Sequence, residues 1–434
     1  MTPLDTWLAR IERLHHRPIE LGLARVREVA HRLDLQLACA SVVVAGTNGK
    51  GSTCAMLDAI LRAAGYRVGR YSSPHLLRFN ERAAIDGELV GDEDLICQFE
   101  AVERARGEVS LTYFEFTTLA ILRLFAARKL DVAVLEIGLG GRLDAVNLVD
   151  ADCSIVTSVG LDHADFLGPT RESVGFEKAH VYRGGRVAVC ADRSPPDTLV
   201  DYARSIGADL RILGRDFEAV MEPAGATPSG MPMQWTFRGA NSRRAALPIP
   251  SLRGAHQLQN AAGALAALEA LSTRLPLAQQ AVREGLLRAH VQGRFQVLPG
   301  RPAMVLDVAH NPQAAQALAA TLRTHPCSGR TLAVFAMLRD KDAAGVAEAL
   351  REQVHRWFLA PTSGARGLDA NALQDLVRAG ESRATCFDSV ALALRGAREA
   401  AGPDDRILVF GSFVTVAEAM RELQIDGLAP KGSK

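Results

Sequence analysis

One stretch near the N-terminus, residues 42–53, constrains the fold more than any other. It reads Val-Val-Val-Ala-Gly-Thr-Asn-Gly-Lys-Gly-Ser-Thr. A β-branched run leads into a glycine-rich turn, and an apolar-periodic helix is expected to follow over residues 54–64. Glycines let backbone N–H groups close around phosphate oxygens, and the helix N-terminus adds the positive end of its dipole. The sequence therefore predicts a strand, a phosphate-binding loop and a helix.

The spacing of this loop departs from the usual G-x-x-x-x-G-K-[ST] pattern. Val44 stands where the first glycine belongs, and Gly51 separates Lys50 from the hydroxyl of Ser52. Lys50 is still placed to reach the β- and γ-phosphates, and a hydroxyl to ligate Mg²⁺. On these residues alone, a glycine-rich turn that binds no nucleotide remains the alternative.

Polar residues also stand at the ends of two further predicted strands. Ser72-Ser73-Pro74-His75 follows a strand expected over residues 66–71, and Glu136 lies near the end of an apolar strand over 131–137. An open α/β sheet binds its ligands at the carboxyl ends of its strands. An acid at such a strand tip, in a chain with a phosphate loop, is typical of a metal ligand. The alternatives are a proline-initiated turn and a capping or surface carboxylate.

A fourth strand, expected over residues 154–159, leads to Asp162, His163 and Asp165. Three such groups within four residues are suited to bind a metal or to orient a phosphate. A lone histidine after a strand is more often held by a backbone carbonyl, so this signal is weak alone. Lys178 falls on the next predicted helix, where a lysine is ordinarily exposed to solvent.

The chain has 434 residues, more than one core usually serves, so two domains are expected. The breaker cluster Leu298-Pro299-Gly300-Arg301-Pro302 marks the boundary. Residues 1–297 are predicted to form a P-loop-type ATP-binding domain with a mostly parallel sheet, and 298–434 a smaller Rossmann-like α/β domain. Apolar strands spaced by helices indicate a parallel sheet there; they are expected at 303–308, 331–336, 355–360, 383–386 and 405–410. Residues 221–250 read as an edge hairpin or insertion.

The first strand of the second domain ends in Asp307, which is followed by His310 and Pro312. An Asp and a His three residues apart, just before a helix that starts with proline, face a ligand by their position. An Asx-type cap of that helix is the alternative interpretation.

Composition excludes several partners. There are 50 basic and 49 acidic residues, so charge gives no argument for nucleic acid or an anionic membrane. The seven cysteines are scattered without a C-x-x-C pair, which indicates reduced thiols. Neither a signal peptide nor an apolar run of about 18 residues is evident. A cytoplasmic protein, expected to be a monomer, is the interpretation.

Taken together, these stretches resemble the folylpolyglutamate synthases, and more closely the bifunctional bacterial members that are also dihydrofolate synthases. The resemblance covers nearly the whole chain, and the unusual loop spacing is that family's own form. It rests on nine segments in this order: Ala45–Ser52, Ser72–His75, Tyr113–Phe116, Glu136–Asn147, Leu161–Gly168, Phe176–Lys178, Gln257–Asn260, Gly293–Phe295 and Asp307–Pro312.

The resemblance implies ATP and two Mg²⁺ sites as cofactors, and assigns roles to residues. The implied ATP contacts are Thr47, Asn48, Gly49, Lys50, Gly51, Ser52, Asn260, Arg294 and Asp307. The implied metal ligands are Ser73, Glu136 and His163. Lys50, Lys178 and His310 are the implied catalytic residues, and Lys178 matches a lysine that the family can carry as a carbamate. The implied dihydropteroate site comprises Glu20, Leu21, Gly22, Leu23, Thr112, Tyr113, Phe114, Glu115, Leu143, Asp144 and Ala145.

The implied reaction is ATP-driven amide formation between L-glutamate and dihydropteroate or a reduced folate, through an acyl phosphate. The C-terminal domain would bind the glutamate side of the cleft. A folylpolyglutamate synthase without the second activity is one alternative. A muramyl-type ligase is another, but those enzymes carry a UDP-sugar domain before the phosphate loop, where only about 40 residues stand here. A P-loop switch or motor ATPase would give no reason for Asp307 and His310, and a non-catalytic binding module is least favoured.

Overall fold

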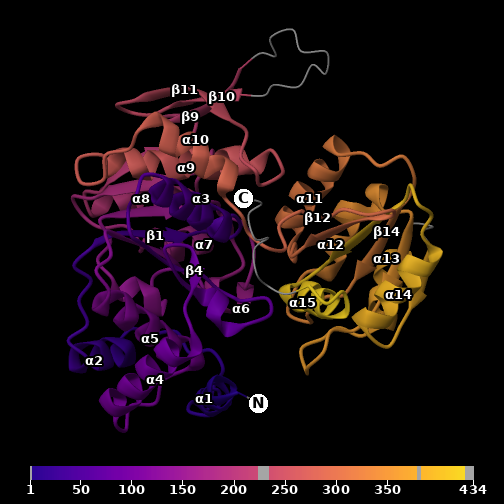
Figure 1. The fold of residues 1–434 in the computed structure, drawn as a ribbon, viewed down its shortest axis with the longest axis horizontal. Helices are drawn as coiled ribbons and strands as arrows, with labels where there is room; N and C mark the ends of the chain where they lie inside the picture. Colours follow the sequence, from indigo (N-terminus) through magenta and orange to yellow (C-terminus); the bar gives the residue numbers. More distant parts are fainter. Residues whose placement is uncertain (1, 223–233, 379–382, 426–434) are drawn as a thin grey trace.

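The computed structural model describes residues 2–222, 234–378 and 383–425. Two α/β domains lie side by side, the N-terminal one larger (Figure 1). Each is built on its own mainly parallel sheet, with helices against both faces. The predicted fold class is therefore confirmed.

The N-terminal sheet has eight strands in the order β4-β3-β2-β5-β1-β6-β7-β8. The six from β2 to β8 in that order are parallel, and β3 and β4 form an antiparallel edge. The strands are β1 (Ala40–Ala45), β2 (Val68–Tyr71), β3 (Ala83–Ile85), β4 (Glu88–Leu89), β5 (Val132–Glu136), β6 (Cys153–Val156), β7 (Val187–Cys190) and β8 (Asp209–Ile212).

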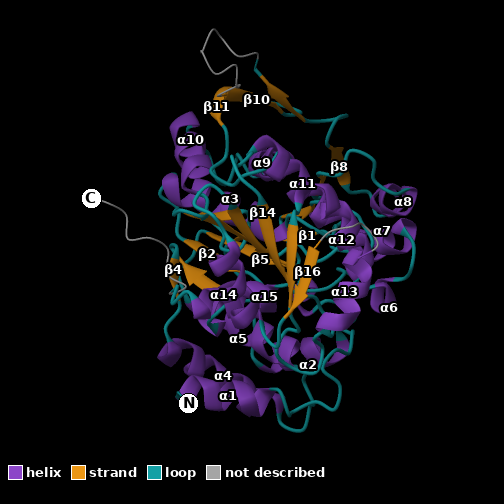
Figure 2. Cartoon of the chain, turned by 90° about the vertical axis from the view of Figure 1, so that its right-hand side faces the viewer, coloured by secondary structure: helices purple, strands orange, loops and turns teal. Residues whose placement is uncertain are grey.

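Helices cover both faces of this sheet (Figure 2). One layer consists of α3 (Lys50–Ala63), α9 (His256–Ala270) and α10 (Gln279–Arg288). The other layer consists of α1 (Pro3–Ile11), α2 (Ala24–Arg32), α4 (Asp92–Arg106), α5 (Tyr113–Ala127), α7 (Arg171–Ala179) and α8 (Asp197–Ser205). Shorter elements are η1 (Phe79–Arg82), η2 (Ala145–Leu148) and α6 (Ala164–Leu167).

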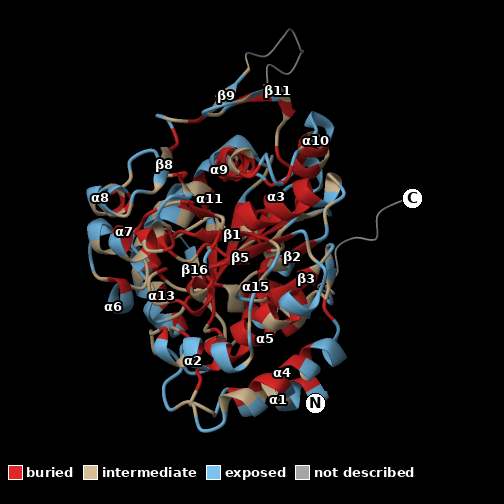
Figure 3. Cartoon of the chain, turned by 90° about the vertical axis from the view of Figure 1, so that its left-hand side faces the viewer, coloured by how far each residue is buried: buried red, intermediate tan, exposed pale blue. Residues whose placement is uncertain are grey.

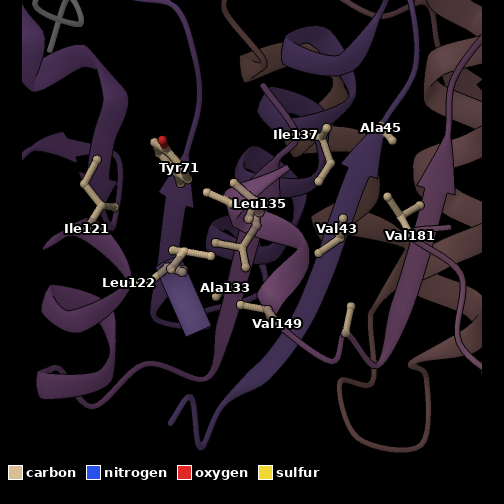
Figure 4. Close-up of a cluster of buried hydrophobic side chains, with 14 of the residues drawn as sticks. Val43, Ala45, Tyr71, Ile121, Leu122, Ala133, Leu135, Ile137, Val149 and Val181 are labelled. Atoms are coloured by element: carbon tan, nitrogen blue, oxygen red, sulfur yellow. The ribbon is translucent and has the colours of Figure 1, made fainter. Parts of the chain in front are cut away.

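The sequence of β1 is apolar except at Ser41, and the burial of the strand explains this. Successive side chains of a strand point to opposite faces. Val42 and Val44 accordingly pack with α3 and α9, whereas Val43 and Ala45 pack in the other core (Figure 4). Both faces are covered, so no position of β1 meets solvent, and the central strands β1 and β5 are buried (Figure 3).

A small antiparallel sheet lies above the α9 layer (Figure 1). It contains β9 (Glu218–Met221), β10 (Gln234–Arg238) and β11 (Arg243–Pro248). It agrees with the predicted hairpin or insertion, although residues 223–233 of that prediction lie outside the described residues.

The C-terminal sheet has six strands in the order β12-β13-β17-β14-β15-β16, and only β12 runs antiparallel. All five predicted strands are present. The strands are β12 (Gln296–Leu298), β13 (Ala303–Asp307), β14 (Thr331–Phe335), β15 (Arg356–Leu359), β16 (Arg383–Cys386) and β17 (Arg406–Phe410). The helices are α11 (Pro312–Thr324), α12 (Ala343–Leu350), η3 (Arg351–Gln353), α13 (Ala370–Arg378), α14 (Val390–Ala400) and α15 (Phe413–Glu422). The predicted domain boundary at 297/298 falls inside β12.

Sheet order fixes where functional loops meet. The chain leaves β1 for one side of the sheet and later returns to the other, so β5 and β6 flank β1. Ligands bind at such a switch point, beyond the carboxyl ends of the strands. The loops that follow β1, β5 and β6 therefore converge, although the first follows Ala45 and the other two follow Glu136 and Val156.

Within the described residues, no helix is long and apolar enough to cross a membrane. None of the seven cysteines forms a disulfide within the described residues.

Candidate active site at the domain interface

A cleft of about 790 Å³ opens between the two domains. Its walls combine the loops after β1, β2, β5 and β6 with the loops after β13, β14 and β17. Of the residues implied by the family resemblance, all line this cleft except Leu23 and Tyr113. Leu23 is buried in the core of the N-terminal domain, and Tyr113 packs against Phe79.

The phosphate loop leaves the N-terminus of α3 open. Gly49 precedes the helix with φ +90°, a left-handed conformation, and no side chain caps the helix. The helix begins at Lys50, four residues earlier than predicted, because this glycine lets the chain turn directly into it. The first N–H groups of α3 thus have no side-chain acceptor, which suits them for an anion.

Contacts with the segment after β6 fix the loop. A Cβ on Gly46 would lie 1.9 Å from the Thr157 hydroxyl, so only glycine fits at this position. The Thr47 hydroxyl donates to the carbonyl of Gly160 at 2.9 Å and accepts from its N–H. Lys50 Nζ donates to the carbonyls of Gly46 and Thr47 at 3.1 and 3.3 Å. The lysine ammonium is therefore folded over the loop with no carboxylate partner among the described residues.

Glu136 ends β5 and is buried beside the loop. Its Oε2 accepts the backbone N–H of Ser73 at 3.2 Å. Burial raises the pKa of Glu136, and the nearby charges of Lys50 and Arg294 oppose that rise. A buried carboxylate and a serine that both line the cleft can supply the oxygen ligands that Mg²⁺ prefers. The alternative of a capping or surface carboxylate does not describe this residue.

His163, the third implied metal ligand, lies after β6 with φ +52°. Burial lowers its pKa to about 4, so the ring is neutral at pH 7, as a metal ligand must be. Its Nε2 lies 3.1 Å from Lys341 Nζ. The neighbouring Asp165 is exposed and does not line the cleft.

Lys178 does not occupy the exposed position that is usual for a lysine. It lies on α7 with only 3% of its surface exposed, and it lines the cleft. Burial, reinforced by the charge of Lys50, lowers its pKa to about 7. A large fraction of its amine is therefore neutral near pH 7. The helical pattern alone could not reveal this, because the covering groups come from distant segments.

Asn260, Arg294 and Asp307, the implied nucleotide contacts, also line the cleft. Asn260, from α9, donates to Gln257 at 2.9 Å and lies directly against Gly49. The carboxylate of Asp307 accepts the N–H groups of Phe295 and Ala309, both at 2.8 Å. Arg294 lies between the charges of Asp307 and Glu136, with its guanidinium 5.0 Å from the Phe413 ring centre.

His310 is held at both ring nitrogens. Its Nδ1 lies 2.8 Å from the carbonyl of Val308, so this nitrogen carries the hydrogen. Its Nε2 lies 3.3 Å from Asp162. The next residue, Asn311, caps α11 by accepting the N–H of Ala314 at 2.9 Å. The Asx-cap interpretation of this segment is thus correct for Asn311, while His310 faces the cleft.

Asp162 joins the two domains. Its buried carboxylate contacts Lys341, His310 and Asn311, all from the C-terminal domain. Asn48 of the phosphate loop bonds Asn311 at 3.1 Å and Gln313 at 2.8 Å. The sequence prediction missed Lys341, although its place just after β14, at the carboxyl edge of the sheet, was a usable signal.

The implied dihydropteroate segments form another part of the cleft wall. Gly22 N–H donates to the carbonyl of Leu143 at 3.3 Å, which joins two of them. Phe114 lies against Gly138 and stacks near Tyr71. Some members are held by backbone groups: Glu115 closes a capping box with Thr112, and Asp144 accepts the N–H groups of Leu139 and Val146. Burial raises the pKa of Asp144 to about 6.

Among the described residues, one group of side chains has the spacing of a metal site without having been predicted: His15, His16 and Glu20. Glu20 is already paired with Arg25, which also bonds Glu115 at 2.9 Å. Of this group only Glu20 lines the cleft, and its pairing with arginine gives no indication of a metal centre.

Comparison with known proteins agrees with this geometry. The Mur ligase middle domain matches residues 44–268, and the Mur ligase glutamate ligase domain matches residues 293–413. The dihydrofolate synthase/folylpolyglutamate synthase of Escherichia coli is 44% identical over 96% of this chain and 95% of its own length. The folylpolyglutamate synthase of Lacticaseibacillus casei is 30% identical over 88% and 90%.

Solved structures extend the likeness to the whole fold. Escherichia coli FolC in complex with DHPP and ADP superposes with a TM-score of 0.90, covering 98% of both chains. A bifunctional folylpolyglutamate synthase/dihydrofolate synthase with Mn, AMPPNP and L-glutamate bound gives 0.88 at 44% identity, over 98% and 99% of the two chains. The chain is thus an ATP-dependent ligase by class. It belongs to the Mur ligase family and, within it, to the dihydrofolate synthase/folylpolyglutamate synthases.

Proposed function

We propose that this chain is a bifunctional ligase. It adds L-glutamate to dihydropteroate, which gives dihydrofolate, and to reduced folates, which gives folylpolyglutamates. The observation that carries the proposal is the cleft itself, because it brings an open phosphate loop, a buried carboxylate and the strand ends of a second domain together. The names of the relatives, and their complexes with nucleotide, glutamate and DHPP, support it.

The chemistry follows from the poor electrophilicity of a carboxylate. An oxygen of the substrate carboxylate attacks the γ-phosphorus of ATP and displaces ADP, which leaves an acyl phosphate. The amine of glutamate then attacks the acyl carbon, phosphate leaves, and the amine loses a proton. Lys50 and the first N–H groups of α3 stabilise charge on the phosphates during transfer. Asn260, Arg294 and Asp307 position the nucleotide, and the enclosed cleft keeps water from the acyl phosphate.

Ser73, Glu136 and His163 would hold Mg²⁺. The bound ion would neutralise charge on the transferring phosphoryl group. A second site would be completed by Lys178 as a carbamate. The lowered pKa of this lysine supports that role, because only a neutral amine attacks carbon dioxide.

The carbamate has its own test. Lys178→Ala should lose most activity, and short carboxylates or bicarbonate should partly restore it. Full activity without any addition would show that Lys178 is not needed. Intact-mass analysis gives a second measurement, since a carbamate adds the mass of carbon dioxide.

His310 is the proposed acceptor of the proton from the glutamate amine. Only Nε2 is available for this step, because Nδ1 is bonded to Val308. Accepting the proton requires a ring with no hydrogen on Nε2, and it requires Nε2 to leave Asp162, which a glutamate ammonium near that carboxylate would favour. If His310→Ala turns over normally across the pH range, this role is wrong.

A cytoplasmic location is part of the proposal, and the lack of disulfides among the described cysteines supports it. The implied dihydropteroate segments that line the cleft favour dihydropteroate over a UDP-sugar as the acceptor. They also favour the bifunctional enzyme over a polyglutamylase alone.

A coupled ADP-release assay separates these functions. It offers dihydropteroate, tetrahydrofolate and a UDP-muramyl peptide separately, each with its amino acid. Turnover with the first two is expected. Activity only with tetrahydrofolate would leave a folylpolyglutamate synthase, and activity only with the muramyl peptide would refute the proposal.

A further inference from the structure

Arg82, in the loop that follows β2, is a buried cation without an anionic partner. Only 8% of its surface is exposed, yet it lines the cleft. Its guanidinium lies 5.5 Å from the ring centre of Phe79 and 5.4 Å from that of Tyr113, and its Nε donates to His75 Nδ1 at 3.0 Å. No carboxylate among the described residues lies within ion-pair distance of it. A buried charge in this state is costly unless a ligand completes it.

The neighbouring acids are all engaged elsewhere. Glu81, next to Arg82 in sequence, accepts the N–H groups of Leu76, Leu77 and Arg78. On α15, Glu418 accepts the N–H of Ser363 at 2.8 Å, and Glu422 pairs with Arg395. The fold thus keeps these carboxylates from the arginine.

Arg421 brings a second cation to the same place from the other domain. It lies in the last turn of α15, on the side of the C-terminal domain that faces the N-terminal domain (Figure 1), and it lines the cleft. Arg82 donates to the His75 ring, and the charge of Arg421 also acts on that ring, so both cations lie near His75. Since Nδ1 of His75 accepts from Arg82, its Nε2 carries a hydrogen.

The position of this group suggests what it binds. Tyr113, against which Arg82 packs, stands between Thr112 and Phe114, two of the implied dihydropteroate residues that line the cleft. His75, which Arg82 bonds, lies two residues beyond Ser73, whose N–H bonds Glu136 beside the phosphate loop. The group thus adjoins both the dihydropteroate segments and the segment that carries Ser73. A folate acceptor carries α-carboxylates on its glutamate tail, whereas dihydropteroate carries none.

We propose that Arg82, His75 and Arg421 form a subsite for the α-carboxylates of the glutamate tail that a folate acceptor already carries. The inference rests on the proposed function and deepens it, because it makes this group specific for the tailed acceptor. Charged and bidentate hydrogen bonds of arginine suit a carboxylate.

The test uses Arg421→Ala and the charge reversal Arg421→Glu. Arg421 is exposed in the last turn of its helix, so neither variant should disturb folding. Arg398→Ala, an exposed arginine on the neighbouring helix α14 outside the cleft, is the matched control. KM is measured for dihydropteroate, tetrahydrofolate, tetrahydrofolate diglutamate and L-glutamate, and the diglutamate Kd by calorimetry.

Loss of one charged contact predicts that KM and Kd for the diglutamate rise roughly tenfold or more. The rise should be larger in Arg421→Glu and smaller for tetrahydrofolate, and KM for dihydropteroate and L-glutamate should not change. Equal changes for all acceptors, no change, or a higher KM for L-glutamate in both reactions would overturn the proposal. If the wild-type protein turned over no pteridine acceptor, the proposed function itself would fail, which is a distinguishable result.

Discussion

Two strand-to-helix turns face each other across the cleft, and the helices that follow them begin in opposite ways. The turn from β1 to α3 uses Gly49 and leaves the helix without a side-chain cap. The turn from β13 to α11 uses Asn311 and Pro312, and the Asn311 side chain caps its own helix. An uncapped helix N-terminus can bind a phosphate, whereas in a capped one a side chain already accepts one of the free N–H groups. This difference indicates that phosphates bind on the side of the phosphate loop.

The cations of the two sides follow the same division. Lys341 and Arg294 lie beside Asp162 and Asp307. Lys50 bonds only carbonyl groups of its own loop, and the strongest influences on Lys178 are burial and Lys50. The phosphate-loop side therefore holds its positive charge ready for a ligand. Four changes test this comparison.

The largest effect is expected from Lys50→Met. It removes the cation above the phosphates, and losing one preorganised contact to a transferring group costs about 10²–10³ in kcat. ADP release in the presence of all substrates measures it. Lys129→Met, an exposed lysine of the same domain, is the control and should behave as wild type. A loss below about threefold would contradict the role of Lys50 in phosphoryl transfer.

Gly49→Ala changes the turn at the uncapped N-terminus of α3. The φ of +90° disfavours a Cβ, and that atom would lie 2.5 Å from Asn260 Oδ1. We expect a nucleotide Kd at least about tenfold higher, by calorimetry, because both the turn and Asn260 must shift. Gly65 offers a matched control, since its φ of +88° is similar but nothing lies within 4 Å of an added Cβ. Gly65→Ala should lose stability while the nucleotide Kd stays constant; equal Kd values in both variants would refute the argument.

Lys178→Met tests the cost of a buried cation. The pKa of Lys178 falls from 10.5 to about 7 on folding. Below pH 7 both the folded and unfolded states are protonated, so the full penalty is present. Between pH 7 and 10.5 the unfolded state binds the proton that the folded state lacks, so stability rises with pH. The variant should unfold in urea with a free energy a few kcal/mol higher than wild type at pH 6, a gap that shrinks toward pH 10 in CO₂-free buffer. A difference in unfolding free energy that does not change with pH would contradict the destabilising effect of a buried cation at Lys178.

Asn311→Ala should have the smallest effect on stability, about 1 kcal/mol for a lost N-cap. It also removes bonds to Asn48 and Asp162 across the cleft. Ser389→Ala removes the cap of α14, on the far helix layer, and should cost similar stability without altering KM for ATP. If Asn311→Ala and Ser389→Ala changed the KM for ATP equally, the contact between Asn311 and Asn48 would have no role in the site.

The fold was largely predictable from sequence because its signals are local. Five apolar runs became the predicted strands of the second domain, and the glycine pattern located the phosphate loop. The start of α3 was misplaced, since the left-handed conformation of Gly49 depends on what packs against it.

Site residues were harder to predict where the burial of a side chain determines its chemical role. Lys178 reads as a surface lysine, and only tertiary packing from distant segments buries it. Lys341 stands just after β14, a usable signal that the prediction missed, whereas Arg82 lines a cleft that forms only where the two domains meet. Glu136 and Asp307 were found because strand ends at a sheet edge are a topological signal that sequence carries.

The central claim, that a carboxylate is activated by phosphoryl transfer in this cleft, has a direct test. Dihydropteroate labelled with ¹⁸O in its carboxylate is converted with ATP and L-glutamate, and the released phosphate is analysed by mass spectrometry. An acyl phosphate transfers one labelled oxygen from the carboxylate to phosphate in each turnover. Phosphate that contains no ¹⁸O while dihydrofolate accumulates would contradict the account.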